Sequence, residues 1–228
     1  MDRSSCVVLV PVATYIEPEC AQGLMDLERL GYPVWRVYGC SAIDQARSQL
    51  ATDALAKGYE ELMWIDSDIR FPVAAVDTLR SHDLPMVCGI YPKKGAREIV
   101  CNLNEGTDRL VFGAEGGLLE IHYAATGFLL TKRYVYEKIA VQENLPVCNE
   151  RFGKPVVPYF LPMVVPDGDK QWYLGEDFAF SERARRSGIP IHADTRIRLG
   201  HTGRYDYSWE DAGSERERYS TYRFSIQH

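Results

Sequence analysis

Leu62-Met63-Trp64-Ile65-Asp66-Ser67-Asp68 is the most informative segment of the chain. Its four leading apolar residues are typical of a short strand that is buried on both faces of an α/β sheet. The strand pattern stops abruptly at two aspartates in positions i and i+2. Because ligands bind beyond the carboxyl ends of parallel strands, the stretch predicts both the sheet and the edge where its site lies.

The segments on either side of this strand alternate between strand and helix patterns. Apolar runs and helical spacing, with glycines or a proline at the ends, predict the following order: strand 7–12, helix 18–30, strand 34–37, helix 43–58, strand 62–65, a helix that begins near Pro72, and strand 86–90. This alternation predicts an α/β protein with a mostly parallel central sheet and helices on both faces.

The second half of the chain is less regular. We expect strands at 118–122 and 125–130, a short helix at 134–139, a helix at 176–187 closed by Gly188, and extended segments at 189–193 and 196–199. Residues 144–172 are rich in proline and aromatic side chains and are predicted to form a long loop. That loop is either a lid over a ligand or a rigid insertion.

Composition narrows the classes of function. A chain of 228 residues fits one domain, and its formal net charge of −6 argues against a general nucleic-acid binder, which needs a basic field. The local pair Lys93-Lys94 still suits a small phosphorylated ligand. The six cysteines show no Cys-x-x-Cys spacing, and no apolar run approaches the roughly 20 residues of a membrane helix. We therefore expect a soluble, reduced, cytoplasmic protein without a signal peptide or transmembrane segment.

Asp66 and Asp68 form the first candidate site. Mg²⁺ and Mn²⁺ prefer oxygen ligands and usually share their coordination with substrate phosphates. One carboxylate would hold the cation while its neighbour orients a ribose or another ligand. The structural alternative is a solvated turn, or a helix cap ahead of Pro72.

Glu176 and Asp177 form the second candidate site. They follow Gly175 at the start of a predicted helix, where acidic residues often do no more than complement the helix dipole. Aromatic residues surround them, and a carboxylate near an aromatic wall has its pKa raised, which suits a general base.

His201 is the third candidate. A lone histidine is more often structural than a ligand, but here Gly200 and Gly203 flank it and let the backbone approach a ligand closely. Imidazole is an acceptable ligand for Mn²⁺ beside carboxylates and phosphates.

The order of these motifs resembles that of the GT-A glycosyltransferases. The chain is most similar to short, single-domain, family-2-like members from bacteria, phages and large viruses. Besides the motifs above, the resemblance rests on three stretches: Ile43-Asp44-Gln45-Ala46-Arg47, Cys88-Gly89-Ile90-Tyr91-Pro92-Lys93-Lys94 and Ala125-Thr126-Gly127-Phe128. It covers about residues 6–205, and the order and spacing of the motifs are more specific than any one of them.

The resemblance implies a GT-A, Rossmann-like fold over residues 1–228 as a single domain. About residues 1–100 would be the half that binds a nucleotide sugar. About residues 101–205 would be the acceptor and catalytic half, a smaller mixed region, and residues 206–228 a polar and aromatic tail. At the start of the tail and just before it, Tyr205, Tyr207 and Trp209 either stack on an acceptor sugar, form a subunit contact or pack on the core.

The resemblance also implies roles for individual residues. Asp68 would coordinate Mn²⁺ or Mg²⁺ on the donor diphosphate, Asp66 would contact the ribose or the water shell of the metal, and His201 would complete the metal site. Asp177 would be the base for the acceptor hydroxyl, with Glu176 orienting donor or acceptor. The remaining nucleotide-sugar contacts would come from Pro11, Val12, Thr14, Asp44, Arg47, Lys93, Lys94, Thr126 and Gly127.

The implied activity is metal-dependent transfer of a sugar from a nucleoside-diphosphate sugar to a hydroxyl of a glycan, lipid-linked or protein acceptor, with inversion. The first strand lacks the acidic residue that many family members place near uracil, so the base stays open, with UDP and GDP favoured. Two alternatives remain. One is a nucleotidyltransferase that forms sugar nucleotides, which would normally carry a Gly-rich basic loop where this chain has Ala13-Thr14-Tyr15. The other is a non-catalytic nucleotide-sugar-binding module.

Overall fold

The computed structural model describes residues 2–203, 205–213 and 220–226. Within them the largest sheet has seven strands in the order β2-β1-β3-β8-β5-β11-β7. Their bounds are β1 Cys6–Val12, β2 Val34–Tyr38, β3 Glu61–Ile65, β5 Met86–Gly89, β7 Leu118–Ile121, β8 Phe128–Lys132 and β11 Ile191–Asp194. Strands β2, β1, β3, β5 and β11 point the same way, whereas β8 and β7 run against their neighbours. The expectation of a mostly parallel sheet is confirmed.

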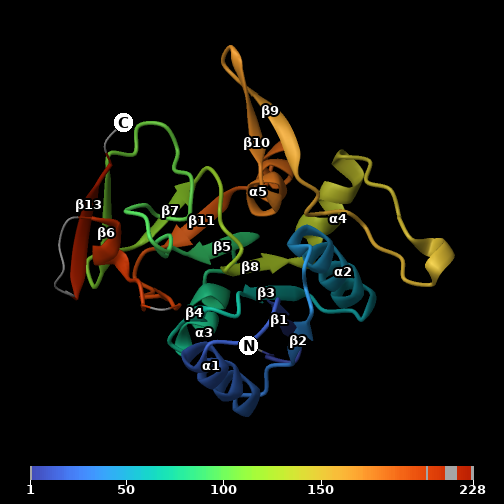
Figure 1. Cartoon of the computed structure of the whole chain (residues 1–228), viewed down its shortest axis with the longest axis horizontal. Coiled ribbons are helices and arrows are strands. Elements are labelled where there is room, and N and C mark those ends of the chain that lie inside the picture. The colour runs from blue at the N-terminus through green and yellow to red at the C-terminus, as the bar shows by residue number, and fades with distance from the viewer. Residues whose placement is uncertain (1, 204, 214–219, 227–228) are drawn as a thin grey trace.

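Helices cover both faces of this sheet (Figure 1). They are α1 Pro18–Arg29, α2 Ile43–Ala56, α3 Ala74–Ser81, α4 Arg133–Gln142 and α5 Glu176–Arg186. Successive side chains of β1 point to opposite faces, so Val8 packs in one core with α1 and α3 and Leu9 in the other with α2, α4 and α5. The sequence alternation predicted this layered α/β fold.

The other strands of the described residues form three small two-stranded sheets. They pair β4 Ile69–Arg70 with β12 Gly200–His201, β6 Arg109–Gly113 with β13 Thr221–Ser225, and β9 Met163–Asp167 with β10 Lys170–Leu174. Short 3₁₀ turns lie at η1 Glu150–Phe152 and η2 Trp209–Ala212. The β6–β13 and β9–β10 sheets lie at different places around the main sheet (Figure 1).

The prediction of one long loop over residues 144–172 is wrong for its last part, because residues 163–172 belong to the β9–β10 hairpin. Two residues, Gly168 and Asp169, connect the strands, and Gly168 has a φ of +57°. A two-residue hairpin loop needs positive φ at its first position, which glycine adopts without steric cost. Figure 1 shows this hairpin projecting from the body above α5. The extended segment expected at 196–199 is also wrong, since a turn there leads into β12.

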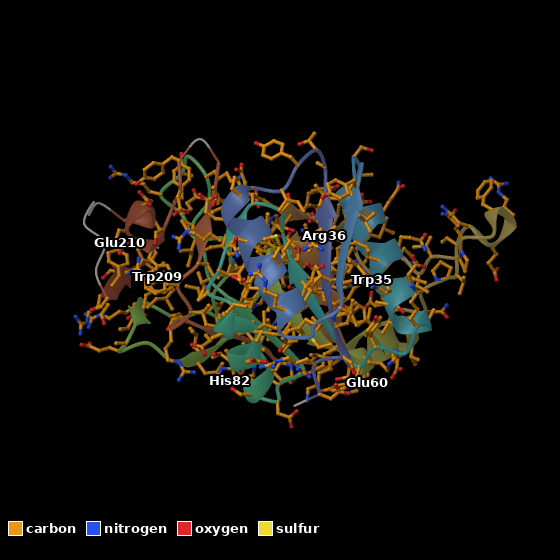
Figure 2. All side chains as sticks on the ribbon, turned by 90° about the horizontal axis from the view of Figure 1, so that it is seen from below. Trp35, Arg36, Glu60, His82, Trp209 and Glu210 are labelled. Atoms are coloured by element: carbon orange, nitrogen blue, oxygen red, sulfur yellow. The ribbon has the colours of Figure 1, made fainter. Side chains whose placement is uncertain are left out.

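The described part of the tail packs on the core through Trp209. Its indole is buried, stacks on Phe112 at 4.9 Å between ring centroids and donates to the carbonyl of Ile90 at 3.4 Å. Ser208 and Asp211 form a capping box that starts this turn. Figure 2 shows Trp209 and Glu210 at the end of the molecule away from Trp35 of β2. Residues 204, 214–219 and 227–228 of the tail region lie outside the described residues.

Two further properties concern the described residues as a whole. None of their helices is both long enough and apolar enough to cross a bilayer. The six cysteines all lie among them, and each is a free thiol.

Candidate active site at the carboxyl ends of the strands

Asp66 lies directly after β3 and is held by two contacts. Its backbone N–H donates to the carbonyl of Gly127 at 3.0 Å, and its Oδ1 accepts a hydrogen bond from Nη2 of Arg47 at 2.7 Å. Arg47 on α2 is only 3% exposed, and its Nε lies 3.4 Å from Oε1 of Glu176 on α5. The buried guanidinium thus joins the Asp-x-Asp segment to the start of the Glu-Asp helix, 129 residues further along the chain than Arg47.

Asp68 and His201 meet because of the short β4–β12 ladder. This ladder pairs His201 with Ile69, and the N–H of Thr202 donates to the carbonyl of Asp68 at 2.7 Å. As a result Nε2 of His201 lies 3.4 Å from Oδ2 of Asp68. Asp68 and His201 are far apart in sequence, and the pairing of the two-residue strands β4 and β12 brings them together.

The tautomer of His201 follows from its second contact. Nδ1 lies 2.9 Å from the carbonyl oxygen of Pro92, which only accepts hydrogen bonds, so Nδ1 carries the proton. Nε2 is therefore the nitrogen that faces the Asp68 carboxylate: it donates to Asp68 in the protonated ring and has its lone pair available for a metal in the neutral ring. A histidine that binds a metal usually has its other nitrogen fixed in this way.

Lys94 places a positive charge on the same carboxylate. Its Nζ lies 2.5 Å from Oδ2 of Asp68. Burial alone would raise the pKa of Asp68, but the contacts with His201 and Lys94 outweigh burial and lower it. Asp68 is thus held ionised, as a metal ligand must be.

The donor set fits a hard cation that the protein shares with a substrate. One carboxylate and one imidazole with its tautomer fixed converge here, while Asp66 is engaged by Arg47. No group of three or more His, Cys, Asp or Glu side chains within the described ranges is placed to hold a metal alone. Magnesium-type cations are commonly bound by one or two protein groups together with phosphate oxygens.

Tyr91 is a site residue to which the sequence assigned no role. Its hydroxyl accepts a hydrogen bond from the N–H of Gly127 at 3.0 Å, and its ring meets the ring of His201 edge-on at 5.2 Å. Burial, together with the charges of Asp66 and Asp177, raises the pKa of Tyr91 far above its usual value. A Cβ on Gly127 would lie 2.1 Å from that hydroxyl, so only glycine fits there. The stretch that contains Tyr91 was visible in the sequence, but its burial against His201 was not.

Asp177 lies in the first turn of α5 and has a different environment from Asp68. Its Oδ1 accepts a hydrogen bond from the N–H of Phe178 at 2.7 Å. Burial and the neighbouring Glu176 carboxylate raise the pKa of Asp177 to about 6. The raised pKa that the sequence suggested for this position is present.

An aromatic wall and a large cleft adjoin Asp177. The ring of Phe178 lies 5.3 Å from Tyr123 and 6.1 Å from Trp172. Asp177, Phe178 and Trp172 line a cleft of about 1230 Å³, together with Lys93 and residues of the 97–107 segment and β13. Asp68 and His201 are not in its lining. They are connected to its edge through Asp66, Arg47 and Glu176.

The remaining predicted site residues are more scattered. Pro11 and Val12 end β1 and are buried, whereas Thr14 is exposed in the turn that follows. Asp44 is half-buried in the first turn of α2, and Lys93 pairs with Glu98 at 2.5 Å. Thr126 is buried beside Gly127.

A second hollow of about 330 Å³ lies at the amino end of β3. It is lined by Glu60, Glu61, Lys132 and Arg133 among others, and contains none of the predicted site residues. Ligands of parallel sheets bind at the other end of the strands, so this hollow is not the candidate site.

Comparison with known proteins gives similarity in structure alone. No protein-family model and no curated protein sequence matches the chain. The crystal structure of A197 from STIV aligns with a TM-score of 0.55 and 16% identity, over 86% of this chain and 85% of that one.

Two further solved structures align less well. GalNAc-T7 with UDP, GalNAc and Mn²⁺ aligns with a TM-score of 0.46 and 14% identity, over 86% of this chain and 43% of that one. A glycosyltransferase involved in the glycosylation of the major capsid of PBCV-1 gives 0.34 and 14%, over 61% and 65%. At these identities the likeness concerns the fold alone, and this chain shares its fold with A197 from STIV. Its mostly parallel α/β sheet with helices on both faces is of the Rossmann-like kind that the sequence resemblance implied.

Proposed function

We propose that the protein is a metal-dependent glycosyltransferase that moves a sugar from a nucleoside-diphosphate sugar to an acceptor hydroxyl, with inversion and with Asp177 as the base. The proposal rests on how the candidate metal ligands are connected to the candidate base. The Asp68–His201 pair, with its tautomer fixed by Pro92, is connected through Asp66, Arg47 and Glu176 to Asp177 at the edge of a cleft.

On the donor side, Asp68 and His201 would hold Mn²⁺ or Mg²⁺ together with the diphosphate of a UDP- or GDP-sugar. When bound, the cation supplies Lewis-acid stabilisation of the charge that develops on the departing diphosphate. Lys94, now paired with Asp68, has the length and charge to move to a phosphate oxygen. Asp66, fixed by Arg47, would orient the ribose.

On the acceptor side, Asp177 would remove the proton. The acceptor oxygen forms a bond to the anomeric carbon as the bond from that carbon to the diphosphate oxygen breaks. The bonding electrons leave with the diphosphate, and the proton of the hydroxyl goes to the Asp177 carboxylate. A carboxylate whose pKa is raised to about 6 is ionised at neutral pH and is more basic than an ordinary aspartate.

Transfer to water tests this function without knowledge of the acceptor. The protein would be incubated with UDP-, GDP- and dTDP-sugars and Mn²⁺, with release of nucleoside diphosphate measured and the anomer of the released sugar followed by NMR. We expect release from one donor class, with inversion, and a loss of at least a hundredfold in Asp177→Asn.

Other outcomes would point elsewhere. Near wild-type release by Asp177→Asn would remove Asp177 as the base, and retained configuration would remove inversion. Pyrophosphate release from a nucleoside triphosphate and a sugar 1-phosphate would favour the nucleotidyltransferase alternative. Nucleotide-sugar binding without any turnover would favour a non-catalytic module.

A further inference from the structure

The cleft beside Asp177 has a shape that the proposed transfer reaction does not by itself require. Its volume of about 1230 Å³ exceeds the 300–1000 Å³ typical of a small-molecule site. It extends from Asp177 along the 97–107 segment to β13, so its lining comes from both the catalytic half and the tail. Such a cleft has room for a ligand much longer than a single sugar ring.

The wall of the cleft nearest Asp177 is aromatic. Trp172 on β10 lies 5.7 Å from Tyr123 and 6.1 Å from Phe178, measured between ring centroids, and Trp172 and Phe178 both line the cleft. Flat apolar faces beside a few polar groups are what bind the C–H faces of a ring that carries hydroxyls on its rim. Asn102 lines the same cleft and adds an amide side chain.

The hairpin is responsible for this orientation of Trp172. Side chains alternate along a strand, so Trp172 and its partner Val165 face the body while Tyr173 and its partner Val164 face solvent. Tyr173 is 67% exposed and Val164 59% exposed. Of the neighbouring aromatic residues Trp172 and Tyr173, only Trp172 therefore borders the cleft.

The charges around the cleft balance. The lining contains three cationic and three anionic side chains among the described residues: Lys93, Arg97, Arg223, Glu98, Glu105 and Asp177. Lys93 pairs with Glu98, and Arg223 pairs with Glu115. A polyanion, a lipid diphosphate or a strongly charged peptide would find no complementary field here, whereas an uncharged ligand needs none.

We propose that this cleft binds a neutral oligosaccharide chain, with its terminal ring on Trp172 and one hydroxyl of that ring at Asp177. This inference rests on the proposed function and narrows its acceptor from a glycan, lipid-linked or protein hydroxyl to an uncharged glycan of several rings. The exposed hairpin is then the element that carries acceptor recognition.

A glycan array tests the proposal independently of catalysis. The probes are oligomers of glucose and of N-acetylglucosamine with one to six rings, uronic-acid and sialylated glycans, and serine- or threonine-containing peptides. We expect binding to neutral oligomers that increases over the first few rings, a loss of at least tenfold in Trp172→Ala, and a partial loss in Trp172→Phe. Tyr173→Ala is the matched control and should bind like the wild type.

Several results would overturn the proposal. These are binding of only charged glycans or peptides, no binding of any probe by folded protein, or equal losses in Trp172→Ala and Tyr173→Ala. Release of nucleoside diphosphate from donors, measured in parallel, separates this failure from failure of the proposed function. If the protein turns over a donor but binds no neutral glycan, only the proposal for the cleft is rejected. If it binds neutral glycans but turns over no donor, only the proposed transferase function is rejected.

Discussion

Asp68 and Asp177 are two aspartates of one site whose environments shift their pKa values in opposite directions. Contacts with His201 and Lys94 lower the pKa of Asp68 despite its burial, whereas burial and Glu176 raise that of Asp177 to about 6. Pairs of carboxylates that are separated in this way commonly divide two chemical roles between them. In the proposed reaction Asp68 would stay ionised as a metal ligand and Asp177 would take up the proton.

The raised pKa of Asp177 predicts the pH dependence of turnover. Asp177 is an effective base only when ionised, so kcat/KM for nucleoside-diphosphate release should fall tenfold per pH unit below about pH 6. A pH–rate profile in the presence of saturating Mn²⁺ measures this. A flat profile between pH 5 and 7 would contradict the assignment.

The same shift predicts a gain in stability on removing the charge. The native state holds the Asp177 proton more tightly than the unfolded chain, whose pKa is near 3.8, so ionisation costs stability above about pH 6. Asp177→Asn should therefore raise the free energy of unfolding by up to about 3 kcal/mol at pH 8. The gain should vanish below about pH 4, where the wild-type side chain is protonated in both states. Urea titrations at the two pH values would show it, and a loss of stability at pH 8 would refute it.

The ion pair between Lys94 and Asp68 predicts that metal binding and donor binding are coupled. The ammonium group of Lys94 would compete with Mn²⁺ for Asp68, and a diphosphate would relieve that competition by pairing with Lys94 instead. Lys94→Met should bind Mn²⁺ alone about tenfold more tightly, and UDP more weakly, than the wild type. Calorimetric titration measures both affinities. Lys93→Met, whose native partner is Glu98, is the matched control, and equal Mn²⁺ affinity in both variants would exclude the competition.

At the scale of elements, Arg47 connects α2, the end of β3 and the start of α5. Its replacement by methionine would leave Asp66 and Glu176 without a cationic partner, which typically costs about 3–5 kcal/mol at a buried site. For a chain of this size that lowers Tm by about 6–20 °C. Thermal unfolding followed by circular dichroism measures the change.

Two variants control the Arg47 prediction. Adding Glu176→Gln should recover part of the loss, because it removes one of the two unpaired charges. Arg36→Met breaks an ion pair with the partly exposed Glu28 and should change stability by less than about 1 kcal/mol. An Arg47→Met protein as stable as Arg36→Met would show that the connection between the elements is unimportant.

Local patterns predicted the elements of the first half because each element there follows its own periodicity. The helix expected at 18–30 is α1 Pro18–Arg29, and the strand expected at 62–65 lies within β3 Glu61–Ile65. The reversed direction of β8 was not predictable, because an apolar run looks the same in either orientation. The β9–β10 hairpin carried a recognisable signal in Gly168-Asp169, which the surrounding prolines and aromatic residues obscured.

The candidate site was predictable in its residue types but not in its contacts. Asp66, Asp68, Asp177 and His201 stand out by their neighbours in sequence. Their connections run through long-range pairings, the β4–β12 ladder and the Arg47 bridge, which leave no periodic signal. Tyr91 and Trp172 were overlooked because a buried aromatic residue usually belongs to the core.

At the scale of the whole molecule, the candidate site has two parts, the Asp68–His201 pair and the cleft with Asp177, which the Asp66–Arg47–Glu176 contacts connect. The Asp68–His201 pair lies where β3 and β12 bring loops together, and the cleft with Asp177 opens between the hairpin, the 97–107 segment and β13. The described tail takes part in this arrangement, since Trp209 fixes it on the core and β13 lines the cleft. The proposed reaction would place the donor diphosphate at the Asp68–His201 pair and the acceptor in the cleft, with the two meeting at Asp177.

Calorimetric titration of UDP-, GDP- and dTDP-sugars, with and without Mn²⁺, tests the central claim most directly. We predict that one donor class binds the wild-type protein only with Mn²⁺ present, and that Asp68→Asn and His201→Gln lose this binding while remaining folded. Binding that is equally tight without metal, or that survives in both variants, would contradict the account, as would no binding of any of these donors.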